Sequence, residues 1–427
     1  MSGSTPAHPS AQRFDQVLAR RGLNGRVREL PSSTRTAVEA AEAVGCDVGQ
    51  IVKSLVFRTA RSGHPVLVLT SGRHRVDERE VGRFAGEPLV RADPEFVRTV
   101  TGFAIGGVPP AGHPAPLPTY VDYDLLEFRE LWAAAGHPHA ICRLTPTELL
   151  DLTGGRAVPV AALPPGPLPR SPWITFDCYG TLVDWRRGLL TALEERVGRL
   201  TAARADAVFR GYLRTEMQLE TLPYRRYREI MAEAIASAAS QEGIALSPSD
   251  AERIPESIPG WPLFPDTREG LARLRDQGFH TAILSNIDRD LFDATLRAGG
   301  LDVSASVTAE EVGAYKPAPA HWVRFLKGTA APPEEVWHAA GSYEHDVSPA
   351  ARLGFRTALV ARYPNTATGP AAKTVVSDLA ELAAVVTVRT PGRNESRRRW
   401  GAGVPGPEAG ASGPAVRQFP DRPARSQ

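Results

Sequence analysis

Cysteine is scarce in this chain, and long apolar runs are missing. The 427 residues contain three cysteines, Cys46, Cys142 and Cys178, which are too few for a disulfide scaffold or a zinc ribbon. No apolar run reaches the ~18 residues that a membrane helix needs. The first residues, MSGSTPAHPSAQRF, lack the apolar core of a secretion signal. We therefore expect a cytoplasmic protein with no membrane partner.

The chain also lacks a large net charge of either sign. The net charge is +2, and the 42% hydrophobic and 23% charged residues are typical of a soluble globular protein. Eight arginines and three acids fall in residues 389–427, so this segment carries +5 and the remainder carries −3. The bulk charge thus excludes a basic nucleic-acid-binding domain, and any contact with RNA must come from a local site.

Two Pro/Gly-rich stretches divide the sequence. We place a first domain over 11–157, a semi-rigid proline-rich linker over 158–171 and a second domain over 172–388. The segment 389–427 has almost nothing to bury and is expected to be a disordered basic tail.

The first domain mixes helices and strands without regular alternation, which predicts an α+β fold. Turn formers separate two β-rich runs, 51–59 and 64–72, which we expect to pair. Helical spacing marks 76–86. The remaining expectations are helices at 37–43 and 144–155, a loop at 101–114 and a strand at 118–128.

The second domain alternates strands with helices, which predicts a doubly wound parallel sheet of the α/β class. The expected strands are 173–180, 280–286, 336–342 and 356–362, and a helical stretch of about eighty residues follows the first of them. Ligands in such sheets lie beyond the carboxyl ends of the strands.

Polar residues fall at these strand ends. Asp177 is placed to act as a nucleophile that forms an ester later hydrolysed by water, or merely to cap the next turn. Lys316 is suited to hold Asp177 ionised and to stabilise an anion. Asp346 is suited to hold Lys316 in place or to activate water.

Three small hydrogen-bond donors accompany them. Thr181, Ser285 and Asn286 are suited to bind an oxyanion or a carboxylate group. Four motifs around these residues, taken in their order along the chain, resemble those of the haloacid dehalogenase superfamily. They are FDCYGTLVDW (176–185), LSNID (284–288), GAYKPAP (313–319) and GSYEHDVSPAARLG (341–354).

This resemblance implies a Rossmann-like core, a helical cap near 186–263 and Asp177 as the nucleophile. Phosphatases of the superfamily carry a second acid where this chain has Tyr179, and a magnesium-binding acid where it has Gly341. The chain is instead similar to the 2-haloacid dehalogenases, which need no metal. A phosphatase that requires Mg²⁺, or a scaffold without activity, remains the alternative.

The dehalogenase resemblance also implies roles for substrate-binding residues. Asp177 would displace halide from a small-molecule substrate whose carboxylate Ser285 and Asn286 hold. Arg214, in the cap segment YLRTEMQLE, is a candidate clamp for halide or carboxylate, and an exposed helix arginine is the equal alternative.

The first domain offers a strand lysine, Lys53, and a glycine loop, Gly106-Gly107. A lysine held by strand packing can bind a phosphate or carboxylate, and glycines let backbone N–H groups approach a ligand. A strand-edge lysine and a plain turn are the alternatives.

Four segments of this domain resemble the YbaK/prolyl-tRNA synthetase-associated editing domain: GCDVGQIVKSLVF (45–57), VLVLTSGRHRVD (66–77), TGFAIGGVPPAGH (101–113) and YVDYDLL (120–126). The resemblance implies removal of wrongly attached amino acids from the aminoacylated 3′ end of tRNA, without cofactor or metal. Lys53 would engage the terminal phosphate or the aminoacyl group. Gly106 and Gly107 would orient the ester carbonyl. Recognition of tRNA without catalysis is the alternative.

Overall fold

A computed structural model describes residues 6, 8–31, 36–161, 168–169, 172–364, 366–386 and 417–418. These residues fall into two compact units that divide near residue 165. Much of the predicted linker and nearly all of the predicted tail lie outside the described residues. Arg417–Gln418 of that tail form a short strand, β15, beside β11 (Ala305–Thr308).

The described strands of the first unit form one mixed sheet in the order β1-β7-β6-β2-β3-β5-β8, with β4 beside β2. The predicted pair of runs forms its centre, because β2 (Ile51–Thr59) and β3 (Pro65–Ser71) pair antiparallel. The other strands are β1 (Val27–Glu29), β4 (Leu89–Arg91), β5 (Thr119–Asp122), β6 (Leu131–Ala134), β7 (Ala140–Leu144) and β8 (Arg156–Val158).

Local capping signals set the helices of this unit. Thr36 and Glu39 form a capping box at the start of α2 (Ala37–Val44), and Gly45 ends it in the left-handed conformation. The other helices are α1 (Pro9–Ala19), α3 (Glu78–Ala85), α4 (Pro94–Thr101) and α5 (Pro146–Thr153), with the short turns η1 (Val48–Gln50) and η2 (Tyr123–Glu127).

Several strands are shorter than predicted, most of all the run 118–128 of the first unit, which is β5 (Thr119–Asp122) in the structure. The expected run 118–128 ends at Asp122, because the carboxylate of Asp122 accepts the N–H of Asp124 and starts the 3₁₀ turn η2. The α+β class of the first unit is confirmed.

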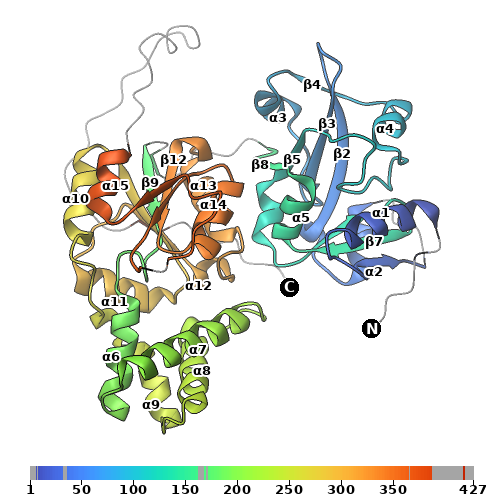
Figure 1. Cartoon of the computed structure of the whole chain (residues 1–427). Helices are drawn as coiled ribbons and strands as arrows, with labels where there is room; N and C mark the ends of the chain where they lie inside the picture. The colour runs from blue at the N-terminus through green and yellow to red at the C-terminus, as the bar shows by residue number, and fades with distance from the viewer. Residues whose placement is uncertain are drawn as a thin grey trace. The chain divides into compact units, whose positions relative to one another are not determined.

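The second unit contains the predicted parallel sheet. Among the described residues its strands run in the order β14-β13-β12-β9-β10-β11-β15, and every pair is parallel. Figure 1 shows α10 and α15 on one side of this sheet and α13 and α14 on the other, so the doubly wound class is confirmed. The further strands are β9 (Trp173–Phe176), β10 (His280–Ser285), β12 (Val336–Ala340), β13 (Arg356–Val360) and β14 (Thr374–Val376).

Helices of the second unit belong either to the sheet layers or to a separate helical group, the cap, which Figure 1 shows beyond one edge of the sheet. The cap contains α6 (Trp185–Val197), α7 (Ala202–Glu220), α8 (Tyr227–Gln241), α9 (Pro248–Arg253) and η3 (Pro255–Gly260). The sheet layers contain α10 (Thr267–Asp276), α11 (Arg289–Gly299), α12 (Ala309–Val312), α13 (Ala320–Thr329), η4 (Pro333–Glu335), η5 (Tyr343–Val347), α14 (Ser348–Arg352) and α15 (Leu379–Val385).

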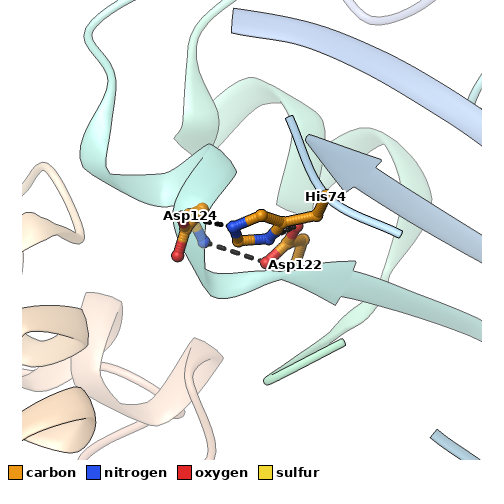
Figure 2. Close-up of side chains that lie close together, drawn as sticks. All are labelled: His74, Asp122 and Asp124. Atoms are coloured by element: carbon orange, nitrogen blue, oxygen red, sulfur yellow. Dashed lines mark hydrogen bonds and ion pairs between the residues drawn. The ribbon is translucent and has the colours of Figure 1, made fainter. Parts of the chain in front are cut away.

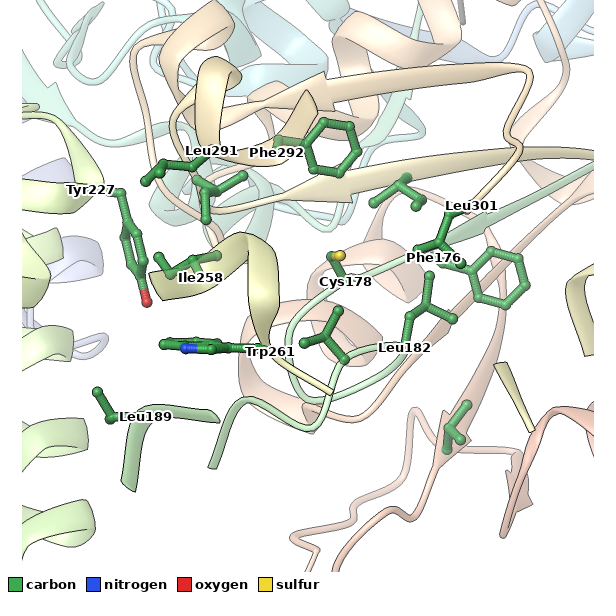
Figure 3. Packing of buried hydrophobic residues seen from close by; sticks show 14 of the residues in the cluster. Phe176, Cys178, Leu182, Leu189, Tyr227, Ile258, Trp261, Leu291, Phe292 and Leu301 are labelled. Carbon is green, nitrogen blue, oxygen red and sulfur yellow. The ribbon is translucent and has the colours of Figure 1, made fainter. Parts of the chain in front are cut away.

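One hydrophobic core joins the cap to the sheet. Figure 3 shows Phe176 and Cys178 of the sheet edge in the same cluster as Ile258 and Trp261 of the cap, with Phe292 of α11 beside them. Burial of this surface fixes the strand that leads into Asp177. In the described part of the chain, no helix has the length and apolar character needed to cross a bilayer.

Truncation of Phe292, which is fully buried, tests the importance of this core. We expect Phe292→Ala to lower the free energy of unfolding of the second unit by about 3–5 kcal/mol, because it leaves a cavity. Denaturant unfolding measures the loss. The control is Met217→Ala on the 47% exposed Met217, and equal effects of the two changes would contradict the assignment.

Candidate active sites

Strand β9 places Asp177 at the carboxyl edge of the second sheet. Its Oδ2 accepts a hydrogen bond from Thr181 Oγ1 at 2.8 Å, and Thr181 Oγ1 accepts the N–H of Gly341 at 2.8 Å. The turn between Asp177 and Thr181 needs Gly180, whose φ is +94°. Two of the predicted site residues therefore meet in one turn.

Lys316 reaches the same edge from the segment after α12. Its Nζ donates to Asp177 Oδ1 at 2.8 Å, to Asp346 Oδ1 at 2.5 Å and to the carbonyl of Leu284 at 2.9 Å. An ammonium group has three donors, so all three are used. The structure thus brings Asp177, Lys316 and Asp346 together.

His338 of β12 completes this group. Its Nε2 lies 3.2 Å from Asp346 Oδ1, and its Nδ1 lies 2.8 Å from Thr175 Oγ1. Burial acts to raise the pKa of Asp346, but Lys316 and His338 outweigh it and lower that pKa to about 2. Asp346 therefore carries a full negative charge that holds Lys316.

Asp177 differs from Asp346 in its charge balance. Burial raises the pKa of Asp177, Lys316 and the Thr181 hydroxyl oppose that rise, and the nearby Asp346 adds to it. Burial acts to lower the pKa of Lys316, but the two carboxylates outweigh it and keep the ammonium charged. The Lys316 ammonium therefore forms ion pairs with both Asp177 and Asp346.

These residues do not fit a magnesium site. The Lys316 ammonium bonds both carboxylates, Asp177 and Asp346, that would have to bind the ion. A side chain does not fit at Gly341, because its Cβ would lie 2.3 Å from the carbonyl oxygen of Gly180. A second acid cannot be accommodated there without a shift of the backbone.

Two residues at the end of β10 were predicted to bind a substrate carboxylate. Ser285 is buried. Asn286 bonds the Lys316 backbone, since its Oδ1 accepts the Lys316 N–H at 2.7 Å and its Nδ2 donates to the Lys316 carbonyl at 3.2 Å. Asn286 Nδ2 also donates to Glu220 Oε1, at 3.3 Å, which brings the end of α7 to this site.

The predicted clamp, Arg214, lies elsewhere on the cap. Arg214 is exposed on α7. Six residues separate it from Glu220, a rotation of roughly 240° about the helix axis, so the two side chains leave α7 on different sides. The structure therefore favours the alternative of an exposed helix arginine.

A cavity of about 480 Å³ opens in the first unit beside β2. Lys53, Val56, Ile105 and Gly106 all line it. Lys53 Nζ donates to the backbone carbonyls of Gly72 at 3.2 Å and His74 at 2.5 Å. Burial lowers the pKa of Lys53. The predicted lysine and the first glycine of the loop therefore share one cavity.

The second glycine of the loop has a different environment. The N–H of Gly107 donates to the carbonyl of Ala104 at 3.0 Å, and a Cβ at Gly107 would lie 2.9 Å from the Cα of His137. Close packing therefore explains Gly107, and its N–H is not placed to orient an ester carbonyl as predicted. Gly106, with φ of +88°, keeps that predicted role.

His74 lies in the loop whose carbonyl groups accept hydrogen bonds from Lys53, and its ring lies between two carboxylates (Figure 2). His74 Nδ1 lies 2.9 Å from Asp122 Oδ2, and His74 Nε2 lies 3.0 Å from Asp124 Oδ2. The hydrogen bonds that His74 donates to these two carboxylates raise the pKa of His74 to about 10. The three residues also lie close enough together to share a metal ion, provided that His74 gives up its proton.

Comparisons with known proteins match the two units separately. The family profile of the aminoacyl-tRNA editing domain matches residues 31–152, and that of the haloacid dehalogenase-like hydrolase matches residues 172–354. The uncharacterized protein YwhH of Bacillus subtilis (strain 168) is 31% identical over 127 residues, which cover 30% of this chain and 80% of that protein. The chain therefore belongs to the editing-domain family, and its residues 172–354 are similar to the haloacid dehalogenase-like hydrolases.

Two further relatives accompany these matches. The (S)-2-haloacid dehalogenase 4A of Burkholderia cepacia is 28% identical over 199 residues, which cover 44% of this chain and 83% of that enzyme. A solved structure of a proposed trans-editing enzyme for prolyl tRNA synthetase is 53% identical and covers 37% of this chain and 99% of its own, with a TM-score of 0.35. The two profile matches are to hydrolase families, an editing domain over residues 31–152 and a dehalogenase-like domain over residues 172–354.

Sequence reasoning missed three contributors to these sites. His338 is absent from the predicted site residues, yet its Nε2 contacts Asp346 Oδ1. Glu220 went unnoticed, although Tyr212, Glu216 and Glu220 recur every four residues, the spacing of one helix face. His74 was likewise overlooked in the editing domain.

The ion pairs of His74 with Asp122 and Asp124 make a pH-dependent contribution to the free energy of unfolding. Its pKa is raised above the unfolded value, so the contribution is complete below about pH 6.5 and is lost as pH rises through about 10. We expect His74→Asn to cost about 1 kcal/mol at neutral pH and much less at pH 10.5. Chemical denaturation at both pH values measures this. The control is His64→Asn, at an exposed histidine. A loss of stability in His74→Asn that does not change with pH would contradict the assigned ion pairs of His74.

Proposed function

We propose that the editing domain hydrolyses the ester bond of a mischarged aminoacyl-tRNA in the cavity lined by Lys53 and Gly106. The observation that supports this is the Lys53 ammonium at the cavity, with two of its three donors bound to backbone carbonyls rather than to carboxylates. Its charge is therefore left for the terminal phosphate or the aminoacyl group of a tRNA 3′ end.

The walls of the cavity suit an apolar amino-acid side chain. Leu55, Val56, Val76, Val97 and Val108 line it, and apolar walls favour an apolar group. We propose that the backbone N–H of Gly106 donates to the ester carbonyl and polarises it. We infer that the terminal hydroxyl of the tRNA itself helps to activate water, so that no metal is needed.

Substitution of Lys53 tests this proposal. We expect Lys53→Ala to lower the rate of deacylation of mischarged tRNA at least about tenfold, because one ammonium contact to the substrate is lost. Release of the amino acid from a panel of mischarged tRNAs measures it. Lys373→Ala, at an exposed lysine, is the control, and an unchanged rate in Lys53→Ala would remove the role given to Lys53.

For the dehalogenase-like domain we propose hydrolytic dehalogenation of a small 2-halogenated compound through an ester on Asp177. The contact that carries this proposal is the 2.8 Å hydrogen bond between Lys316 Nζ and Asp177 Oδ1, deep at the strand ends. It places a charged partner against a carboxylate whose second oxygen is bonded by Thr181. Such contacts orient a nucleophile and hold it ionised.

The other residues act on the second half of the reaction. Asp346 fixes Lys316, and the Lys316 ammonium lies where charge develops when water attacks the ester carbonyl. His338 bonds Asp346 and so orients it.

We propose that this domain works without a metal and that the protein acts in the cytoplasm.

Loss of the nucleophile tests the dehalogenase proposal. We expect Asp177→Asn to abolish halide release from 2-chloropropionate and 2-chloropropionamide, because an amide is a far weaker nucleophile than a carboxylate. Halide assay of the full chain measures this, and a chelator should leave the wild-type rate unchanged. Magnesium-dependent phosphate release from phosphate esters would instead favour a phosphatase.

A further inference from the structure

The cavity of the editing domain lies along an edge of strand β2. Five consecutive residues, Lys53 to Phe57, line this cavity. Successive side chains of a strand point to opposite faces of its sheet, and here Leu55 packs against one hydrophobic cluster and Val56 against another. A cavity that touches all five residues therefore borders the backbone of β2 and not one face of the sheet alone.

The sheet has a gap at this edge. Strand β6 pairs with Ile51 and Val52, where its ladder with β2 ends, and β4 pairs with Phe57–Thr59. On the opposite edge, β3 pairs with β2 without interruption from Val52 to Arg58. Among the strands that the structure describes, none therefore covers residues 53–56 on the side away from β3.

The ladder with β3 decides which backbone groups face the gap. In an antiparallel pair, every second residue exchanges hydrogen bonds with its partner, and the residues between them direct their N–H and C=O groups away. The N–H of Gly72 donates to the Ile51 carbonyl at 2.8 Å. At the other end, the N–H of Thr59 donates to the His64 carbonyl at 2.9 Å. The odd-numbered residues of β2 thus bond β3, and the N–H and C=O of Ser54 point into the gap.

The side chain of Ser54 is unsatisfied as well. Its Oγ atom is buried and has no hydrogen-bond partner among the described residues. Buried polar groups in folded proteins are nearly always hydrogen-bonded, so an unpartnered serine in a cavity wall indicates a ligand. At the gap, Ser54 presents one N–H donor and one C=O acceptor side by side.

From this arrangement we infer that the aminoacyl group of the substrate pairs with Ser54 like one residue of an added strand. Its α-amino group donates to the Ser54 carbonyl, and its ester carbonyl accepts the Ser54 N–H. An aminoacyl ester has the N–H and C=O groups of a peptide residue, and peptides bind open sheet edges through such bonds. The inference rests on the proposed deacylation and adds the requirement for an α-amino donor.

The pairing divides the work between the walls and the backbone of the cavity. The apolar walls surround the side chain of the amino acid, whereas Ser54 binds the groups that all α-amino acids share. The Ser54 N–H joins that of Gly106 at the ester carbonyl, so two donors stabilise the charge that develops on its oxygen when water attacks. Ser54 thus selects an α-aminoacyl group whatever its side chain.

Removal of the α-amino group tests the pairing. The substrates are tRNAs that carry alanine or valine, each compared with the same tRNA carrying the deamino acyl group, propionyl or 3-methylbutanoyl. The rate with the full chain is divided by the uncatalysed rate of each ester. We expect this acceleration to be at least tenfold larger for the aminoacyl esters, because the deamino esters have no donor for the Ser54 carbonyl.

A backbone substitution tests the Ser54 N–H. Proline has no N–H and is tolerated where that group faces an open strand edge, so we expect Ser54→Pro to lower the deacylation rate at least tenfold. Val27→Pro is the matched control. The outermost strand, β1, bonds the β7 side through Arg26 and Leu30, so the Val27 N–H faces outward, and the control should leave the rate unchanged.

The outcomes separate the two proposals. Equal acceleration of amino and deamino esters, or an unchanged rate in Ser54→Pro, overturns the inference alone. If Ser54→Pro lowers the unfolding midpoint more than Val27→Pro does, the comparison of the esters with the wild type decides. Absence of acceleration for all four esters overturns the proposed deacylation as well.

Discussion

A single buried ammonium organises the larger domain. Lys316 bonds Asp177, Asp346 and the end of β10, so three separate chain segments meet at one nitrogen atom. Burial of a charge is costly unless hydrogen bonds and opposite charges compensate for it. The Lys316 group satisfies that condition, because two carboxylates and one carbonyl use every donor. The position and ionisation of Asp177 therefore depend on Lys316.

The two domains use lysine in opposite ways. Lys316 is neutralised by carboxylates inside the protein, so its charge serves an internal nucleophile. Lys53 bonds backbone carbonyls at the wall of an apolar cavity, so its charge remains for an anionic ligand. This contrast agrees with the proposed substrates, an anionic tRNA end for the editing domain and a small molecule for the dehalogenase-like domain.

Strand ends made much of the dehalogenase-like site predictable. Parallel strands end at the same edge of a sheet, so the motifs around Asp177, Asn286 and Asp346 had to meet once the alternation of strands and helices was recognised. The rotation of a cap helix follows no such rule. Helix α7 is polar on several sides, so the sequence favoured Arg214, whereas packing turned Glu220 inward. In the editing domain, the predicted role of Gly107 failed because its N–H bonds Ala104, a contact set by loop geometry.

The central claim is that Asp177 forms an ester with the substrate. Single turnover with enzyme in excess, in water enriched in ¹⁸O, tests this most directly, with mass spectrometry of the peptide that contains Asp177 and of the product. Attack of water on an ester predicts that the label enters the Asp177 carboxyl group and that the product oxygen stays unlabelled. Label in the product hydroxyl and none in Asp177 would contradict the account.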